Sequence, residues 1–384
     1  MNEYLESYFL QVHVDFPLLH RQTFLQGIAS GLHLTDEGFG AVVLLVCALG
    51  ARFSHNPAAL PPGAGSWQLA GWQWFNLVRE RRKLVPLATT TLYDVQVSAL
   101  AAAYAGTLAL PHTNYAVVAH GLRLAQDLGL HRRITYGDTP TVEGELRKRA
   151  FWCLIMLDRA MCTILGRPCS IQQEDFDLDY LVECDDEYWV TGNPETAFLQ
   201  PSGKPSFISH FNWYLKLSHI QAHALRTIYS LQGAVDLRDP ERAQQVVADL
   251  DSELNAWADS LPPHLKYDVN RVDIPFAAQA ASLHAAYLTL RTFVHRPFMM
   301  CPRTIPAPFP SREICTNAAR ACIHVLERYF VLAGPVHIYH YHLGALFSSA
   351  IILLLNVWQN ASTDPVRDIA HLKTTLCVLK SLEA

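Results

Sequence analysis

Apolar residues recur at steps of three and four along the segment that begins at Glu145. This spacing places them on one face of an α-helix. The stripe comprises Leu146, Ala150, Cys153, Leu157, Met161 and Ile164. Gly166 is predicted to end the helix, because glycine readily adopts the left-handed cap conformation, and Pro168 prevents the helix from restarting. A helix of this length spans about 30 Å, so we expect the rest of the chain to pack around it.

Charged residues occupy two places in this predicted helix. The first turn, residues 145–149, is expected to stay in contact with water, whereas Asp158 and Arg159 lie inside the apolar part. A buried carboxylate is costly unless it is paired and hydrogen-bonded. We interpret Asp158 and Arg159 as a buried structural network with the loop that follows. The alternative is a catalytic acid beside an arginine that binds an anion, but no second catalytic group lies nearby in the sequence.

Helical patterns also cover most of the remaining chain. One is expected to start at Thr35-Asp36-Glu37, with a capping side chain, and to continue through the apolar run 41–49. The others are expected over residues 66–83, 92–110, 112–128, 207–231, 240–261, 277–297, 311–332, 340–358 and 364–382. No segment alternates over strand length, and no Asn-Gly or Asp-Gly pair separates apolar runs. The predicted fold class is therefore all-α, a large domain of packed antiparallel helices over residues 1–384. Residues 183–206 are polar and interrupted by proline and glycine, so a surface loop is expected there, and a place for regulation.

Composition narrows the class of protein. The chain has 384 residues, of which 50% are hydrophobic and 17% charged, so a large core is expected. A net charge of −5 and a pI near 6.4 argue against a surface built for nucleic acid. Nine scattered cysteines without a Cys-x-x-Cys pair suggest reduced, buried thiols in an intracellular protein. The apolar runs 95–110 and 343–358 fall short of the roughly 20 residues that span a bilayer.

Motifs for metal or catalytic chemistry are weak. His337, His340 and His342 form the densest histidine group, which is interpreted as polar residues at a helix start rather than a metal site. The run from Asp175 to Asp179 begins like a calcium loop but lacks the required glycine and glutamate, so an acidic turn is expected. The basic run 79–83 is interpreted as a solvated helix end. Nucleophile elbows, phosphate-binding loops and dinucleotide fingerprints are absent from the sequence.

A series of motifs around the predicted central helix resembles one family. The series is Lys148-Arg149, Trp152, Leu157-Asp158-Arg159, Gly166-Arg167-Pro168, Ile171 and Glu174-Asp175-x-Asp177. It resembles the regulatory (middle homology) domain of fungal zinc binuclear cluster transcription factors. Residues 13–24, 119–132, 254–265 and 293–298 resemble further family segments, and the motifs are strongest over 4–300. The chain departs from the family pattern at Val14 and at Tyr180-Leu181, where proline is more usual.

The resemblance implies a regulatory domain of a nuclear transcription factor, not an enzyme. It implies transcriptional co-regulators or a small effector as partners, with homodimer formation open and no membrane contact. DNA contact is expected from a missing N-terminal cluster of six cysteines, so zinc is expected only there and no cofactor is expected in this chain. The family motif residues, expected to be structural or regulatory, are Asp158, Arg159, Gly166, Arg167, Pro168, Asp175 and Asp177.

Two other functions remain open from the residues alone. One is an α-helical enzyme or small-molecule-binding protein with a pocket between helices, in which Asp158, Arg159, Asp175 and Asp177 supply acids and an anion clamp. The other is a plain interaction scaffold. If the chain is regulatory, we hypothesise that the 183–205 loop and the 166–168 junction belong to its switch.

Overall fold

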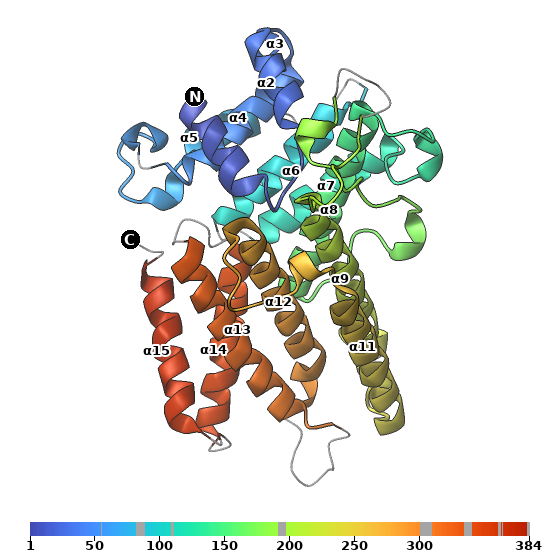
Figure 1. Cartoon of the computed structure of the whole chain (residues 1–384), viewed down its shortest axis with the longest axis vertical. Coiled ribbons are helices and arrows are strands. Elements are labelled where there is room, and N and C mark those ends of the chain that lie inside the picture. Colours follow the sequence, from blue (N-terminus) through green and yellow to red (C-terminus); the bar gives the residue numbers. More distant parts are fainter. Residues whose placement is uncertain are drawn as a thin grey trace. The chain divides into compact units, whose positions relative to one another are not determined.

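The computed structural model describes residues 1–54, 56–81, 89–108, 111–190, 197–299, 309–333, 340–359, 362 and 364–381. Contacts divide the chain into two compact units, Met1–Leu215 and Lys216–Ala384 (Figure 1). Within the described residues every regular element is helical, which confirms the all-α prediction. The expectation of a single domain over residues 1–384 concerns whether the two units fold together, and it stays a prediction.

The first unit contains the helices that precede the central one, together with the central helix itself. They are α1 (Asn2–Ser7), a π-helical turn (Tyr8–Val12), α2 (Arg21–Ala29), α3 (Leu32–Thr35), α4 (Glu37–Ala51), α5 (Trp72–Arg81), α6 (Leu92–Thr107), α7 (Pro111–Asp127) and α8 (Val142–Leu165). The next helix, α9 (Ile208–Thr227), begins in this unit. Helices α4, α6, α7 and α8 pack on one another around a core that includes Tyr8, Leu45, Leu100 and Trp152.

The second unit is a set of longer helices in which consecutive members lie side by side (Figure 1). After the end of α9 it contains α10 (Leu231–Asp236), α11 (Pro240–Ser260), α12 (Ile274–His295), α13 (Ser311–Ala333), α14 (His340–Trp358) and α15 (Pro365–Ser381). From α11 to α15, each helix contacts the next one along the chain. One charged anchor in this unit is the buried Asp368, which binds the Arg320 guanidinium at 2.6 Å.

Two predicted helices are each interrupted, for local reasons. The helix expected over 66–83 is a short 3-10 turn (Trp67–Leu69) followed by α5, because Gly71 has a φ of +80°. A side chain at Gly71 would overlap the backbone of Ala48 in α4, so only glycine fits there. The helix expected over 207–231 ends earlier, and α10 begins at a new cap, where the Ser230 hydroxyl accepts the Gly233 N–H at 2.9 Å.

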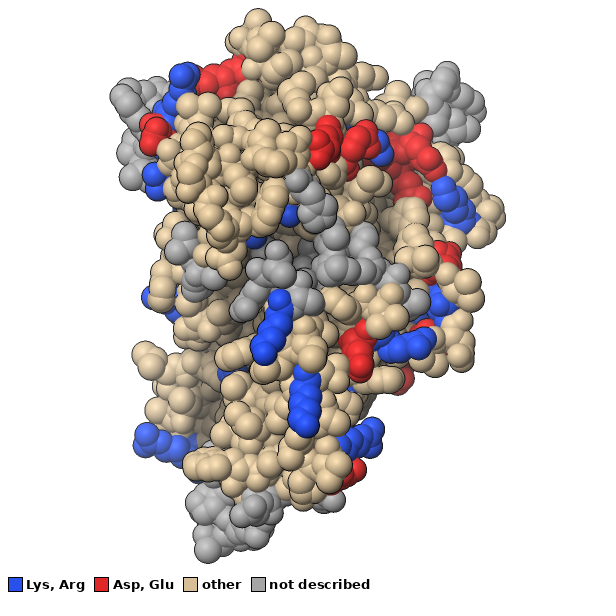
Figure 2. All heavy atoms as spheres, turned by 90° about the vertical axis from the view of Figure 1, so that its left-hand side faces the viewer, with Lys and Arg blue, Asp and Glu red and all other residues tan. Residues whose placement is uncertain are grey.

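Among the described residues no helix could span a membrane, and on one face the basic residues are scattered. Each helix found there is too short or too polar to cross a lipid bilayer. On the face that Figure 2 draws, Lys and Arg stand singly or in small groups among neutral residues. Part of the basic run 79–83 lies outside the described residues, and so does His337 of the histidine group. His342 from that group is buried, with its ring 5.2 Å from that of Tyr329.

Candidate functional site

The central helix α8 begins three residues earlier than predicted and ends at the predicted glycine. The Thr141 hydroxyl accepts the Gly144 N–H at 3.0 Å, which caps the first turn. Gly166 has a φ of +61° and ends the helix, and the Arg167 N–H then bonds to the Cys162 carbonyl at 3.0 Å. This left-handed cap reverses the chain, so the following residues return along α8.

Asp158 and Arg159 are buried and joined to the returning segment. The Asp158 carboxylate accepts the Ser170 N–H at 2.9 Å and the Ser170 hydroxyl at 2.6 Å. The Arg159 guanidinium donates to the Gln173 side chain at 3.3 Å. Burial raises the pKa of Asp158 against these donors and lowers the pKa of Arg159 to about 10. This is the hydrogen-bonded network that the structural interpretation of the pair predicts.

The junction at Gly166, Arg167 and Pro168 connects α8 to α7. The Arg167 guanidinium lies over the Tyr115 ring, 5.0 Å from its centre, and approaches the His112 ring nitrogen at 3.3 Å. The Pro168 carbonyl accepts the Cys162 thiol at 3.3 Å. The motif therefore holds the turn after α8 against the start of the preceding helix.

Asp175 and Asp177 do not converge on a shared ligand position. Asp175 accepts the Gln172 N–H at 2.8 Å and caps a short 3-10 turn. Asp177 accepts the Arg133 N–H at 2.7 Å, and Asp179 binds the Arg133 side chain at 3.2 Å. The acidic segment therefore fastens the returning chain to the turn that precedes α8.

A second buried cluster, which was not predicted from the sequence, lies at the start of α8. Arg149 is 1% exposed, contrary to the expectation of a solvated first turn. Its guanidinium binds the Asp186 carboxylate at 2.7 Å and lies over the Trp189 ring, 4.1 Å from its centre. It also donates to the Leu19 carbonyl at 2.5 Å. We call Arg149, Asp186, Trp189 and their partner His20 the α8 clasp.

Glu145, in the same turn that was expected to contact water, is also buried. The Glu145 carboxylate is buried, binds the Lys148 ammonium at 2.8 Å and accepts the Val182 N–H at 3.1 Å. One feature of the sequence does indicate that Arg149 is buried. It lies three residues before Trp152 and four before Cys153, on the apolar face of the helix. Nothing local in the sequence identifies Asp186, 37 residues away, as its partner.

The described residues of this segment, 183–190 and 197–206, are therefore more than a surface loop. Cys184, Asp185, Trp189 and Ser206 are buried, because their side chains and those of the clasp form a local core. The His20 and Trp189 rings stack 4.7 Å apart, and the His20 Nε2 contacts the Asp186 carbonyl oxygen at 3.0 Å. The segment thus ties α8 to the chain that leads into α2.

The electrostatics of the clasp favour one charge distribution. Burial alone would raise the pKa of Asp186, but the Arg149 guanidinium and the contact with His13 outweigh it and hold that pKa well below its usual range. Burial lowers the pKa values of both His13 and His20 despite the nearby carboxylate. An ionised Asp186, a charged Arg149 and neutral histidines are therefore the stable combination near neutral pH.

A polar pocket of about 420 Å³ lies beside the N-terminus of α8. It is lined by residues from the 133–148 segment together with Leu178 and Asp179. Three of its carboxylates bind cations: Glu143 to Arg147 at 2.6 Å, Glu145 to Lys148 at 2.8 Å and Asp179 to Arg133 at 3.2 Å. Paired charges of this kind hold the walls together and do not form a set of converging catalytic acids.

In the described residues, buried charges fasten the flanking loops to a central helix. The chain belongs to the family described as the fungal specific transcription factor domain, whose model matches residues 5–259. The match includes α8, the junction and the α8 clasp. It confirms the resemblance seen in the sequence motifs.

Curated relatives that match the chain include proteins named as transcription factors. An ABC-transporter-regulating transcription factor of Aspergillus fumigatus is 23% identical, over 98% of this chain and 43% of that protein. Activator of stress genes protein 1 of Candida albicans is 27% identical, over 74% of this chain and 32% of that protein. Cutinase transcription factor 1 alpha of Fusarium vanettenii is 26% identical, over 63% and 25%. The chain spans less than half the length of these relatives, and no solved structure shows significant similarity to it.

Proposed function

We propose that this chain is the regulatory domain of a fungal transcription factor and responds to a partner protein or a small effector. The observation that carries the proposal is the family match over residues 5–259, together with relatives named as transcription factors. These relatives are not enzymes, which agrees with the function expected from the sequence. Nuclear location and transcriptional co-regulators as partners belong to the same proposal, and the family membership supports them.

DNA contact is assigned to a zinc cluster separate from the residues of this chain. That module needs cysteines in Cys-x-x-Cys pairs, because its zinc ions share thiolate ligands. The chain has no such pair, and its net charge is −5. A second copy of the chain remains a candidate partner.

The regulatory switch is proposed to act on α8, because separate segments hold its two ends. The α8 clasp fixes the first turns through Arg149 and Asp186, and the junction with Ser170 fixes the last turn through Asp158. A ligand shifts such a system only if it binds one arrangement better than the other. A partner that binds the segment 183–190 would change the clasp and thereby the start of α8.

A small polar effector is a second candidate ligand, supported by the pocket beside the N-terminus of α8. Its volume of about 420 Å³ lies within the range of small-molecule sites. Lys148 and Glu145 line this pocket, and Glu145 also binds the backbone of Val182. An effector that displaces Lys148 from Glu145 would therefore act on the same segment as the clasp.

A tethering experiment tests the proposed function. The 384-residue chain is fused to an unrelated DNA-binding domain and expressed in a yeast strain that carries a matching reporter gene. We expect the fusion to change reporter transcription relative to the DNA-binding domain alone. Reporter output equal to that of the carrier, with the fusion nuclear and equally abundant, would contradict the proposal.

A further inference from the structure

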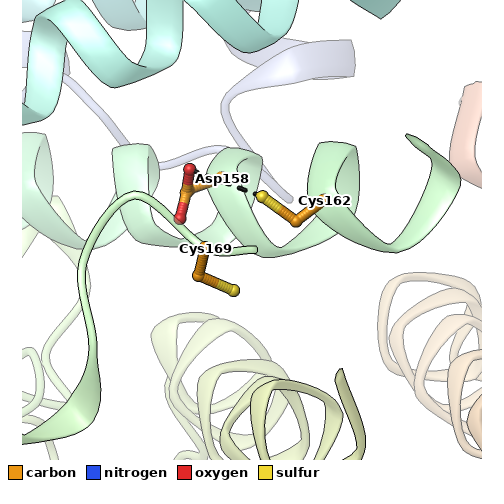
Figure 3. Close-up of side chains that lie close together, drawn as sticks. All are labelled: Asp158, Cys162 and Cys169. Atoms are coloured by element: carbon orange, nitrogen blue, oxygen red, sulfur yellow. Dashed lines mark hydrogen bonds between the residues drawn. The ribbon is translucent and has the colours of Figure 1, made fainter. Parts of the chain in front are cut away.

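Three side chains that can bind metal come together at the last turns of α8. Asp158 and Cys162 are four residues apart on the helix, so they project from the same face (Figure 3). The left-handed turn at Gly166 returns the chain and brings Cys169 alongside them. One carboxylate oxygen and the two sulfur atoms lie within 4.8 Å of one another.

The distances suit coordination to a single ion. Zinc binds thiolate sulfur at about 2.3 Å and carboxylate oxygen at about 2.0–2.2 Å, so neighbouring ligand atoms of a tetrahedral site lie roughly 3.5–3.8 Å apart. The observed upper limit of 4.8 Å is close enough for small side-chain rotations to close the site. Two thiolates with one oxygen ligand favour a thiophilic or borderline ion over Mg²⁺ or Ca²⁺.

We propose that Asp158, Cys162 and Cys169 form a binding site for a thiophilic divalent metal ion, with Zn²⁺ and Cd²⁺ as its probes. Both cysteines bind as thiolates, and their protons pass to solvent. Asp158 contributes one oxygen, and a water molecule takes the fourth position, as in open zinc sites. The sequence predicts no cofactor here, because the two cysteines are seven positions apart and only the fold brings them together.

The surroundings of the three ligands support the site. Ser170 donates its N–H and its hydroxyl to the Asp158 carboxylate, which orients the carboxylate as outer-shell donors do in metal sites. Asp158 and Cys162 are buried, whereas Cys169 is half-buried and provides a route for the ion.

Cadmium titration of the full chain tests the site. The reduced, metal-free protein is titrated with Cd²⁺, and the ultraviolet sulfur-to-cadmium charge-transfer band is recorded. We expect one strongly bound Cd²⁺ per chain, displaced by Zn²⁺. Ser170→Ala should weaken binding about 10- to 100-fold, the usual effect of losing an outer-shell donor. Cys377→Ser removes an exposed thiol far along the sequence and serves as the control that keeps the band.

The cysteine variants decide the outcome. Cys162→Ser and Cys169→Ser should each abolish strong Cd²⁺ binding while circular dichroism stays that of the wild type. If Cys162→Ser fails to fold, the half-buried Cys169→Ser alone is decisive. A band that persists in Cys169→Ser overturns the proposal. Reduced wild-type protein that shows no band overturns it as well.

Discussion

Replacing Arg149 with methionine is the sharpest test of the α8 clasp. The substitution keeps a long side chain against Trp189 but removes the guanidinium that binds Asp186 at 2.7 Å. Arg149 is 1% exposed and the Asp186 side chain 18% exposed, so a poorly hydrated carboxylate loses its cation. Removing one partner of a buried ion pair costs about 3–5 kcal/mol. His13 and the Arg21 N–H still contact Asp186, so we expect about 3 kcal/mol.

Arg147→Met is the matched control, two residues away on the same helix. Arg147 binds Glu143 at 2.6 Å, but their side chains are 37% and 71% exposed. An exposed pair four residues apart on a helix contributes only about 0.3–0.5 kcal/mol. Urea unfolding followed by tryptophan fluorescence compares the two variants, and hydrogen exchange shows whether the loss is local to α8.

The double variant separates charge from packing. Adding Asp186→Asn to Arg149→Met removes the carboxylate that lacks its cation, so part of the lost stability should return. If Arg149→Met costs less than about 1 kcal/mol, or no more than Arg147→Met, the clasp does not stabilise the first turns of α8. Such a result would contradict the stabilising role of the ion pair between Arg149 and Asp186.

Three further predictions concern single positions. Gly166→Ala should destabilise the first unit by about 1–2 kcal/mol in urea unfolding, because its φ is +61°, whereas Gly137→Ala should have little effect since no positive φ constrains it. Metal-free Ser170→Ala should cost about 1.5–3 kcal/mol by the same assay, since Asp158 loses a donor at 2.6 Å. Burial lowers the pKa of His210 to about 4, although Asp15 lies 3.4 Å away. The unfolded imidazole binds a proton below about pH 6.5, so stability should fall as pH drops from 6.5 towards 4. His210→Leu should reduce that slope, and an unchanged slope would contradict the assignment.

Locally encoded features were predictable from the sequence. Asp36 caps α4 by accepting the Phe39 N–H at 2.7 Å, and Gly166 ends α8, as side-chain capping and the freedom of glycine require. The Asp158 network was also predictable from the sequence, because its partner Ser170 follows soon after the chain reverses at Gly166. Interactions between residues that are close in the sequence can be predicted from the types and spacing of those residues.

Interactions between distant segments could not be predicted in the same way. Arg149 looked like part of a solvated turn because Asp186 and Leu19, which bind it, are 37 and 130 residues away. The break at Gly71 depends on the backbone of Ala48 in another helix. Such contacts follow from how helices pack, and a single sequence carries no pattern for them.

Reporter output from the tethered chain shows whether the arrangement of α8 regulates transcription. It is compared at equal abundance between wild type, Arg149→Met and Arg147→Met. We predict an output that differs from the carrier alone and changes several-fold in Arg149→Met, with Arg147→Met like wild type. Identical output from the carrier, the wild type and both variants would contradict the claim.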